Sequence, residues 1–279
     1  MARTAVKLLN LGLGKLFDLL VWPLRPLDPI WALLLISLLA GVMALWIFGK
    51  VSDQERIHRV RDRIRGNVIG IRLFGDDIGL LFRLQGRIVW DTLVYMRYAL
   101  VPTLVLIVPF LLILTQANLR FSVRPLEPGE ATVVKARFAA GPDLVGGEPV
   151  LEVPRGLVVE TPGVHAPEIG ETAWRVRAEA PGTYVVTVRA GGERVAKQIV
   201  VGDAWGAVSP LRTGESVIDM LLYPGEVPIA KESAVRAITV SYPDLPITVL
   251  GWRVHWLIIL FVGVIVFAFA FRGLLGVEI

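Results

Sequence analysis

Three stretches of the chain are apolar for long enough to cross a lipid bilayer. Residues 30–48 hold no charged residue, and 19 residues of helix extend about 28 Å, close to the thickness of a hydrocarbon core. The second stretch, residues 98–117, carries two prolines, and the third, residues 252–271, is followed directly by an arginine. The pattern predicts three transmembrane helices, which we place at residues 29–49, 99–118 and 252–272.

The segment between the first two spans, residues 50–98, has the spacing of two amphipathic helices. In its first half, apolar residues recur every three or four positions and therefore share one helical face: Ile57, Val60, Ile64, Val68 and Ile71. Ser52 with Glu55 matches a capping box at the start of this helix. Gly75 is a turn residue, and Asp76 and Asp77 fit the cap of a second helix better than a cation site. We therefore expect a helical hairpin here.

Arginines dominate the charged positions of this hairpin and lie mostly off its apolar face. The candidate contact residues for an anionic partner are Arg56, Arg59, Arg63, Arg83 and Arg87. Gly79 and Gly86 share a helical face, which leaves room for a close neighbour such as lipid, whose headgroups the arginines would then reach. A hairpin surrounded by solvent is the alternative.

The charge balance differs between the two long loops. Residues 50–99 hold ten Lys/Arg against six Asp/Glu, whereas residues 100–251 hold thirteen against sixteen. The positive-inside rule places the hairpin in the cytoplasm and the second loop outside. Three spans then give a multi-pass protein of the cell inner membrane with its N-terminus outside and its tail, residues 273–279, in the cytoplasm.

Residues 1–28 precede the first span and read as an amphipathic helix lying on the bilayer. Lys7, Asn10 and Asp18 are expected on the face opposite to the apolar one, which comprises Val6, Leu9, Leu13, Leu16, Phe17 and Leu20. Three prolines from residue 23 onward end this helix. A signal peptide is the competing interpretation, but no clear small-x-small cleavage site follows the apolar run.

The second loop alternates apolar and polar residues instead of following a helical period. Runs of this kind occupy residues 131–138, 174–180, 183–190 and 194–201, and Pro181-Gly182 and Gly191-Gly192 separate the later ones as turns. Short strands with such turns predict an antiparallel β-sandwich at residues 119–202. Residues 203–250 are less regular, and we expect residues 203–251 to return the chain to the third span through short strands.

Composition supports a membrane protein and offers little chemistry. The chain is 54% hydrophobic with a mean hydropathy of +0.62, too apolar for an ordinary soluble domain. Its basic isoelectric point would suit nucleic acid, but the charge is sorted by membrane side, so no specific nucleic-acid site is expected. The three histidines, His58, His165 and His255, fall in different compartments. We find no phosphate-binding motif, nucleophile–base pair or metal-ligand spacing, and expect no catalytic residue, metal or cofactor.

Uncharged polar residues within the spans are the remaining site candidates. Residues that might line a polar groove between the spans are Ser37, Thr103, Thr115 and Gln116. The alternative is structural, since a hydroxyl group can bond back to its own helix and Gln116 can lie at the outer interface.

Two parts of the chain resemble known families. Residues 181–202, PGTYVVTVRAGGERVAKQIVVG, look like the closing hairpin of a bacterial immunoglobulin-like domain. The order of span, basic hairpin and span, carried by Lys50–Leu114 together with the third span, resembles the minimal three-span branch of the YidC-type membrane-protein insertases. That resemblance implies a hairpin that meets ribosome or client and spans that form a groove open to cytosol and lipid.

The resulting expectation is a mixed membrane protein with three transmembrane helices, a cytosolic helical hairpin and an exterior all-β, immunoglobulin-like sandwich. Two functions remain open. One is an insertase-like factor that assists membrane-protein insertion or complex assembly, with client membrane proteins or the ribosome as partners beside the lipid bilayer. The other is a non-catalytic scaffold whose exterior β domain binds a partner protein. A polar groove among the spans favours the first, and tight apolar packing favours the second.

Overall fold

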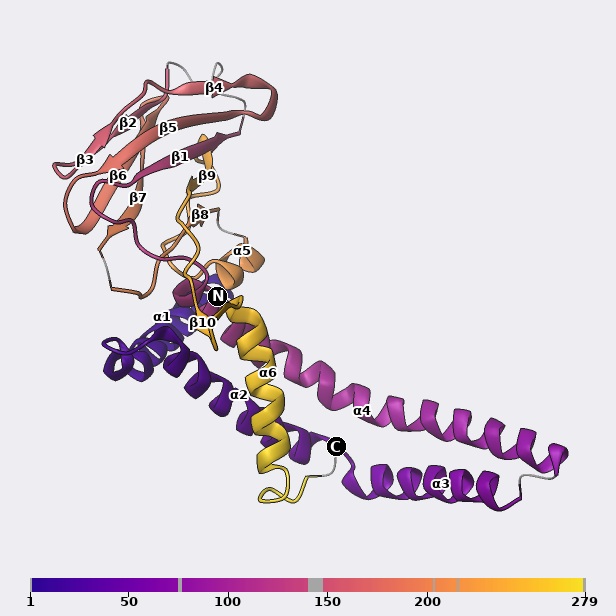
Figure 1. Cartoon of the computed structure of the whole chain (residues 1–279). Helices are drawn as coiled ribbons and strands as arrows, with labels where there is room; N and C mark the ends of the chain where they lie inside the picture. The colour runs from indigo at the N-terminus through magenta and orange to yellow at the C-terminus, as the bar shows by residue number, and fades with distance from the viewer. Residues whose placement is uncertain (1, 75–76, 140–147, 203, 215, 278–279) are drawn as a thin grey trace. The chain divides into compact units, whose positions relative to one another are not determined.

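The computed structural model describes residues 2–74, 77–139, 148–202, 204–214 and 216–277. It shows a mixed α/β chain, in which a helical N-terminal half is followed by antiparallel β-sheets and a C-terminal helix (Figure 1). Internal contacts divide the chain into two units. The first comprises Met1–Leu33 with Leu112–Trp256, and the second comprises Leu34–Leu111 with Leu257–Ile279.

Two helices are long and apolar enough to cross a membrane, α2 (Pro29–Val51) and α4 (Ile78–Phe121). They contain the first two predicted spans, and two such helices are a weak indication of membrane localisation. The third apolar helix, α6 (Trp256–Phe271), has only 16 residues, or about 24 Å of helix. The span predicted at 252–272 is corrected at its start, because β11 (Trp252–Arg253) pairs there with β10 (Thr248–Val249).

The predicted hairpin is built from α3 (Gln54–Leu73) and the first half of α4, which lie side by side (Figure 1). Its helix caps differ from the prediction in one place. Asp53, not Ser52, is the N-cap of α3, and its side chain accepts a hydrogen bond from the Arg56 N–H. Asp77 accepts a hydrogen bond from the Leu80 N–H at the start of α4, as a cap does. Gly75 and Asp76 lie outside the described residues.

The two helices of the hairpin pack in a regular antiparallel register. The Arg56 guanidinium lies 5.8 Å from the Tyr98 ring centroid. The Arg63 Nη2 atom lies 3.1 Å from Asp91 Oδ1, and Gly70 packs against Leu84. Each step of seven residues along α3 thus matches a step of seven residues back along α4, which is the repeat of a coiled coil.

One residue of the predicted apolar face of α3 does not contribute to this packing. Val68 is 41% exposed. Asn67 instead lies between Ile64 and Ile71 on the half-buried face. The reason is that the packed residues of α3 alternate steps of three and four, as a seven-residue repeat requires. This alternation places residue 67, rather than residue 68, on the packed face. Beyond Tyr98, α4 continues without a break through the boundary predicted between hairpin and span.

The N-terminal helix α1 (Ala2–Val21) is present but turns a different face to the protein than expected. Phe17 and Val21 are buried, and Asn10 donates a 2.6 Å hydrogen bond to the Met220 carbonyl in α5 (Val217–Leu222). Asn10 and Asp18 were predicted on the polar, outward face, and this prediction is wrong because both make inward contacts. The outward side of α1 carries the apolar residues Leu8, Leu11, Leu16 and Leu19 beside the exposed Lys7 and Lys15.

The β domain consists of two antiparallel sheets. The larger has the order β3-β5-β1-β9-β8, with β4 on the edge of β5, and the smaller has the order β2-β6-β7. The alternating pattern of the sequence gave the longer strands correctly. The strands are β1 (Ala131–Phe138), β2 (Val150–Glu152), β3 (Leu157–Val159), β4 (Val164–Ala166), β5 (Glu171–Ala178), β6 (Gly182–Ala190), β7 (Glu193–Val201), β8 (Leu211–Thr213) and β9 (Val235–Val240).

Residues from both sheets form one hydrophobic core, which includes Trp174 of β5 and Val188 of β6. Strand β9 lies between β1 and β8 and contributes Ile238 and Val240 to the core. The β domain therefore extends beyond the boundary predicted at residue 202. The reason is that β9 pairs with β1, a strand that precedes it by about a hundred residues and that local sequence patterns cannot reveal.

Candidate functional site

The four polar residues predicted to line a groove each have a local role. Thr103 donates a 2.8 Å hydrogen bond to the Ala99 carbonyl, and Thr115 donates one of 3.0 Å to the Leu112 carbonyl. Both are the bonds of a hydroxyl group to its own helix. Ser37 and Gln116 are buried at two separate packing contacts, described next. These contacts account for the four side chains locally, and the polar groove between the spans stays a prediction.

Ser37 lies where α2 crosses α6. A Cβ atom added to Gly263 would lie 2.7 Å from the Ser37 Cβ atom, and one added to Gly41 would lie 2.9 Å from the Val264 carbonyl oxygen. Ser37 and Gly41 are one helical turn apart, so small residues on α2 let the two backbones approach closely. This is tight packing of two apolar helices rather than a polar path.

Gln116 belongs to a buried polar cluster around Arg120, near the end of α4. Arg120 is 1% exposed. Its Nη1 atom donates 2.9 Å hydrogen bonds to the carbonyl and the Oε1 atom of Gln116. Its Nη2 atom donates to the Gly14 carbonyl at 3.0 Å and to Asp18 Oδ1 at 2.7 Å, and its guanidinium lies over the Phe17 ring. The cluster fastens α1 to the end of α4.

Sequence analysis missed this cluster. Arg120 was not singled out, and Asp18 was predicted on the polar face of an amphipathic helix, so neither was considered as a partner of the other. The only local signal is that a charged residue borders each of two apolar segments. Such residues are more often solvated than buried, and the pairing spans 102 positions of sequence.

The five arginines proposed as cytosolic contacts divide into two groups. On α3, Arg56 pairs with Asp53, Arg59 donates to the Glu55 carbonyl, and Arg63 pairs with the largely buried Asp91. Arg63 therefore supports the hairpin itself. Arg83 and Arg87 of α4 are exposed. Between the helices is an open cleft of about 570 Å³ lined by Arg63, Gly66, Asn67, Arg87, Trp90 and Asp91.

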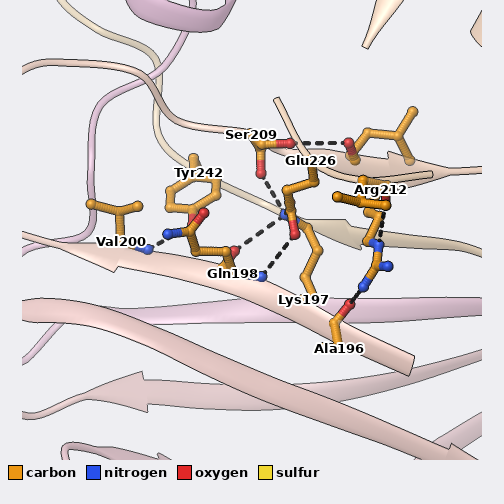
Figure 2. A network of polar contacts seen from close by, with 10 residues as sticks. Ala196, Lys197, Gln198, Val200, Ser209, Arg212, Glu226 and Tyr242 are labelled. Carbon is orange, nitrogen blue, oxygen red and sulfur yellow. Dashed lines mark hydrogen bonds and ion pairs between the residues drawn. The ribbon is translucent and has the colours of Figure 1, made fainter. Parts of the chain in front are cut away.

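A second buried charge cluster lies in the β domain (Figure 2). Lys197 of β7 is 0% exposed, and its Nζ atom contacts Glu226 Oε1 and donates to the Ser209 carbonyl at 2.6 Å and the Gln198 carbonyl at 3.2 Å. The other carboxylate oxygen of Glu226 accepts a hydrogen bond from the Gln198 N–H. Arg212 donates to the carbonyls of Ala196 and Val227 beside it.

The ionisation of this cluster follows from burial. Burial lowers the pKa of the Lys197 amine, and the Glu226 carboxylate opposes that shift. Burial also raises the pKa of the nearby Tyr242, whose hydroxyl oxygen accepts a hydrogen bond from the Val200 N–H. All three protons of a charged Lys197 amine have acceptors, and the side chain does not reach solvent. The arrangement binds residues 209–226 to β7 and is unsuited to attack a substrate.

The described residues contain no group of three or more His, Cys, Asp or Glu placed to hold a metal ion. His165 contacts Thr172 and Glu148 within the β domain. His58 pairs with Asp62 on the surface of α3.

An exposed apolar stripe runs along α4 in the second unit. Its members are Phe82, Val89, Leu93, Met96 and Leu100. Successive members are three or four residues apart, except that seven residues separate Phe82 from Val89, where Gly86 takes the position between them. Each has more than half of its surface exposed, and the stripe faces away from α3. It continues into the apolar half of α4 through Leu104 and Val108. We regard this face of α4 as the candidate functional site.

Comparison with known proteins adds no relative: no protein-family model, no curated protein and no solved structure matches the chain.

Proposed function

We propose that the chain is a multi-pass protein of the inner membrane, with α2, the apolar half of α4 and α6 in the bilayer. The hairpin is cytoplasmic and the β domain is outside, which leaves the N-terminus outside and the C-terminus in the cytoplasm. The support is the length and apolar character of α2 and α4, together with the excess of ten Lys/Arg over six Asp/Glu in residues 50–99.

The β domain is proposed to be an immunoglobulin-like sandwich. Its sheet partition supports this, because β1, β3 and β5 belong to one sheet and β2, β6 and β7 to the other. So does Tyr184 near the start of β6, whose hydroxyl donates a 2.9 Å hydrogen bond to the Ala180 carbonyl. A tyrosine that bonds back across the corner before this strand is a hallmark of that fold.

The function proposed is that of an insertase-like factor that assists the insertion or assembly of membrane proteins. The observation that carries it is the sparse coverage of α4. Only 11% of the most apolar 18-residue stretch of α4 is buried inside the protein, against 39% of the corresponding stretch of α2. An apolar helix that its own chain hardly covers offers a long surface to a client transmembrane helix, and the arginines of α3 can attract an anionic recruiting partner.

A second candidate, a membrane-anchored scaffold, is favoured by a different observation. Ser37, Thr103, Thr115 and Gln116 are all engaged within the protein, and α2 packs tightly on α6 at Gly263. A path for polar loops of a client would need free polar groups in the spans. In the scaffold, the β domain makes the specific contact and the helices serve as the anchor.

Site-specific photo-crosslinking in membranes separates the two functions. A crosslinker at Val108, exposed on α4, should form adducts with newly made membrane proteins, because a client helix would replace lipid there. A crosslinker at Val185, exposed on β6, serves as the matched position on the β domain. Adducts with a resident protein from Val185 alone, with nothing but lipid at Val108, would reject the insertase-like function in favour of the scaffold.

The proposed orientation has a simple test, because the chain contains no cysteine. A single cysteine at Gln85 should be protected from a membrane-impermeant thiol reagent in intact cells, whereas one at Arg194 should be labelled. Both positions are exposed in the structure, so protection reports the membrane side rather than burial. Labelling at Gln85 with protection at Arg194 would reverse the topology.

A further inference from the structure

We propose that the hairpin half of α4 binds the surface of an anionic phospholipid bilayer, with the stripe of Phe82, Val89, Leu93 and Met96 against the acyl chains and arginines on the headgroups. The inference rests on the membrane localisation proposed above and goes beyond it. It gives the hairpin two unlike outer faces, one for lipid and one for solvent.

The first observation is the contrast between the outer faces of the two helices. From residue 55 to residue 65, the exposed positions of α3 are almost all charged: Glu55, Arg56, His58, Arg59, Asp62, Arg63 and Arg65. The corresponding part of α4 exposes the apolar stripe instead, together with Trp90, which is 67% exposed. A hairpin surrounded by water would be polar on both sides. Over this length the hairpin is therefore amphipathic, with α3 charged and α4 apolar, whereas nearer its tip α3 also exposes Ile69 and Leu73.

The second observation is the charge that accompanies the stripe. Arg83, Arg87 and Arg97 are exposed on α4. Asp91, in contrast, is largely buried and pairs with Arg63 of α3. The outward charge of this half of α4 is therefore basic, which complements anionic headgroups. Arginines and a tryptophan beside a broad apolar face are typical of a helix in the bilayer interface.

The third observation is continuity with the apolar half of α4. The stripe runs through Leu100 to Leu104 and Val108 on the same helical face, which the proposed function places in lipid. Pro102 lies between the two halves. It has no N–H to donate to the Tyr98 carbonyl, so the helix can bend there and lay its hairpin half on the bilayer surface. Lipid is therefore the occupant that already adjoins the stripe.

Spin labels on single cysteines test the inference in the full chain, reconstituted in nanodiscs of phosphatidylcholine with or without phosphatidylglycerol. A label at Leu93 should collide with oxygen and be shielded from a water-soluble nickel chelate when phosphatidylglycerol is present. A label at Asp62, exposed on α3, should stay accessible to nickel in both membranes. A label at Val108 reports whether the apolar half of α4 is in lipid at all.

Charge variants make the expected effect quantitative. Replacing Arg83 and Arg97 with glutamine should lower the ratio of lipid-bound to solvated hairpin about 25-fold, roughly five-fold for each arginine near an anionic surface. The matched control, Arg65→Gln with Arg72→Gln, removes the same charge from α3 and should change the ratio little. Raising the salt concentration should act in the same direction as the α4 variant.

The outcomes separate this inference from the proposed function. Nickel accessibility at Leu93 in both membranes, with Val108 in lipid, would overturn the lipid contact and leave the membrane topology intact. Spin–spin coupling between Leu93 labels of two copies would also overturn it, because the stripe would then be a protein interface. Nickel accessibility at Val108 would reject the membrane localisation, and the lipid contact with it.

Discussion

Replacing Lys197 with alanine is expected to destabilise the β domain by roughly 3–5 kcal/mol, the cost of leaving a buried charge without its partner. The side chain of Glu226 is only 11% exposed, so water cannot replace the lost ammonium group. The carbonyls of Ser209 and Gln198 lose their donor as well. Thermal unfolding of the detergent-solubilised chain should show a midpoint lower by about 10 °C.

Two controls isolate the buried ion pair. Lys135→Ala removes an exposed lysine from β1 and should cost little. The double variant Lys197→Met with Glu226→Gln removes both charges while keeping an acceptor for the Gln198 N–H, and it should recover most of the loss. A single variant at Lys197 that is no less stable than the one at Lys135 would contradict the structural role assigned to the pair.

The second large effect is expected at Asp18. Asp18→Ala should cost about 3 kcal/mol and release α1, because it leaves Arg120 charged and 1% exposed beside neutral acceptors only. Arg120→Met should cost less, since the remaining Asp18 side chain is 50% exposed and can be hydrated. The informative result is which variant loses more stability. If only the number of lost contacts mattered, Arg120→Met would cost more than Asp18→Ala.

Trypsin cleavage at Lys15 provides the measurement for this prediction. Lys15 lies on the exposed side of α1, so release of the helix should accelerate cleavage there more than elsewhere. Asp62→Ala is the matched control, because Asp62 pairs with His58 and Arg65 at the surface of the hairpin. Equal cleavage rates in Asp18→Ala and Asp62→Ala would show that the Arg120 cluster does not hold α1.

The two clusters also bear on function. Both bury charge to connect segments that are far apart in sequence, and both pair that charge with a carboxylate of the protein itself. The polar residues that first suggested a groove bond to their own helix or lie at packing contacts. The stripe on α4 is apolar surface that the described part of the chain leaves uncovered, which is why the proposed function and the lipid contact both concern that helix.

The sequence by itself determined the elements with a strong local period. Apolar runs predicted α2 and the apolar half of α4, steps of three and four predicted the hairpin, and alternation predicted β1, β5, β6 and β7. These predictions succeeded because hydrophobic periodicity reflects which face of an element is buried. The cap of α3 moved by only one residue, from Ser52 to Asp53, since both side chains can accept an N-terminal N–H.

Only the tertiary structure decided which polar residues meet. Local pattern could not show that Asp18 meets Arg120, that Lys197 meets Glu226, or that β9 joins the sheet beside β1. It also could not show that Trp252 belongs to strand β11, so that helix α6 begins only at Trp256. The reason is that a polar or interfacial residue is stable either in water or with a buried partner, and the choice depends on segments distant in sequence.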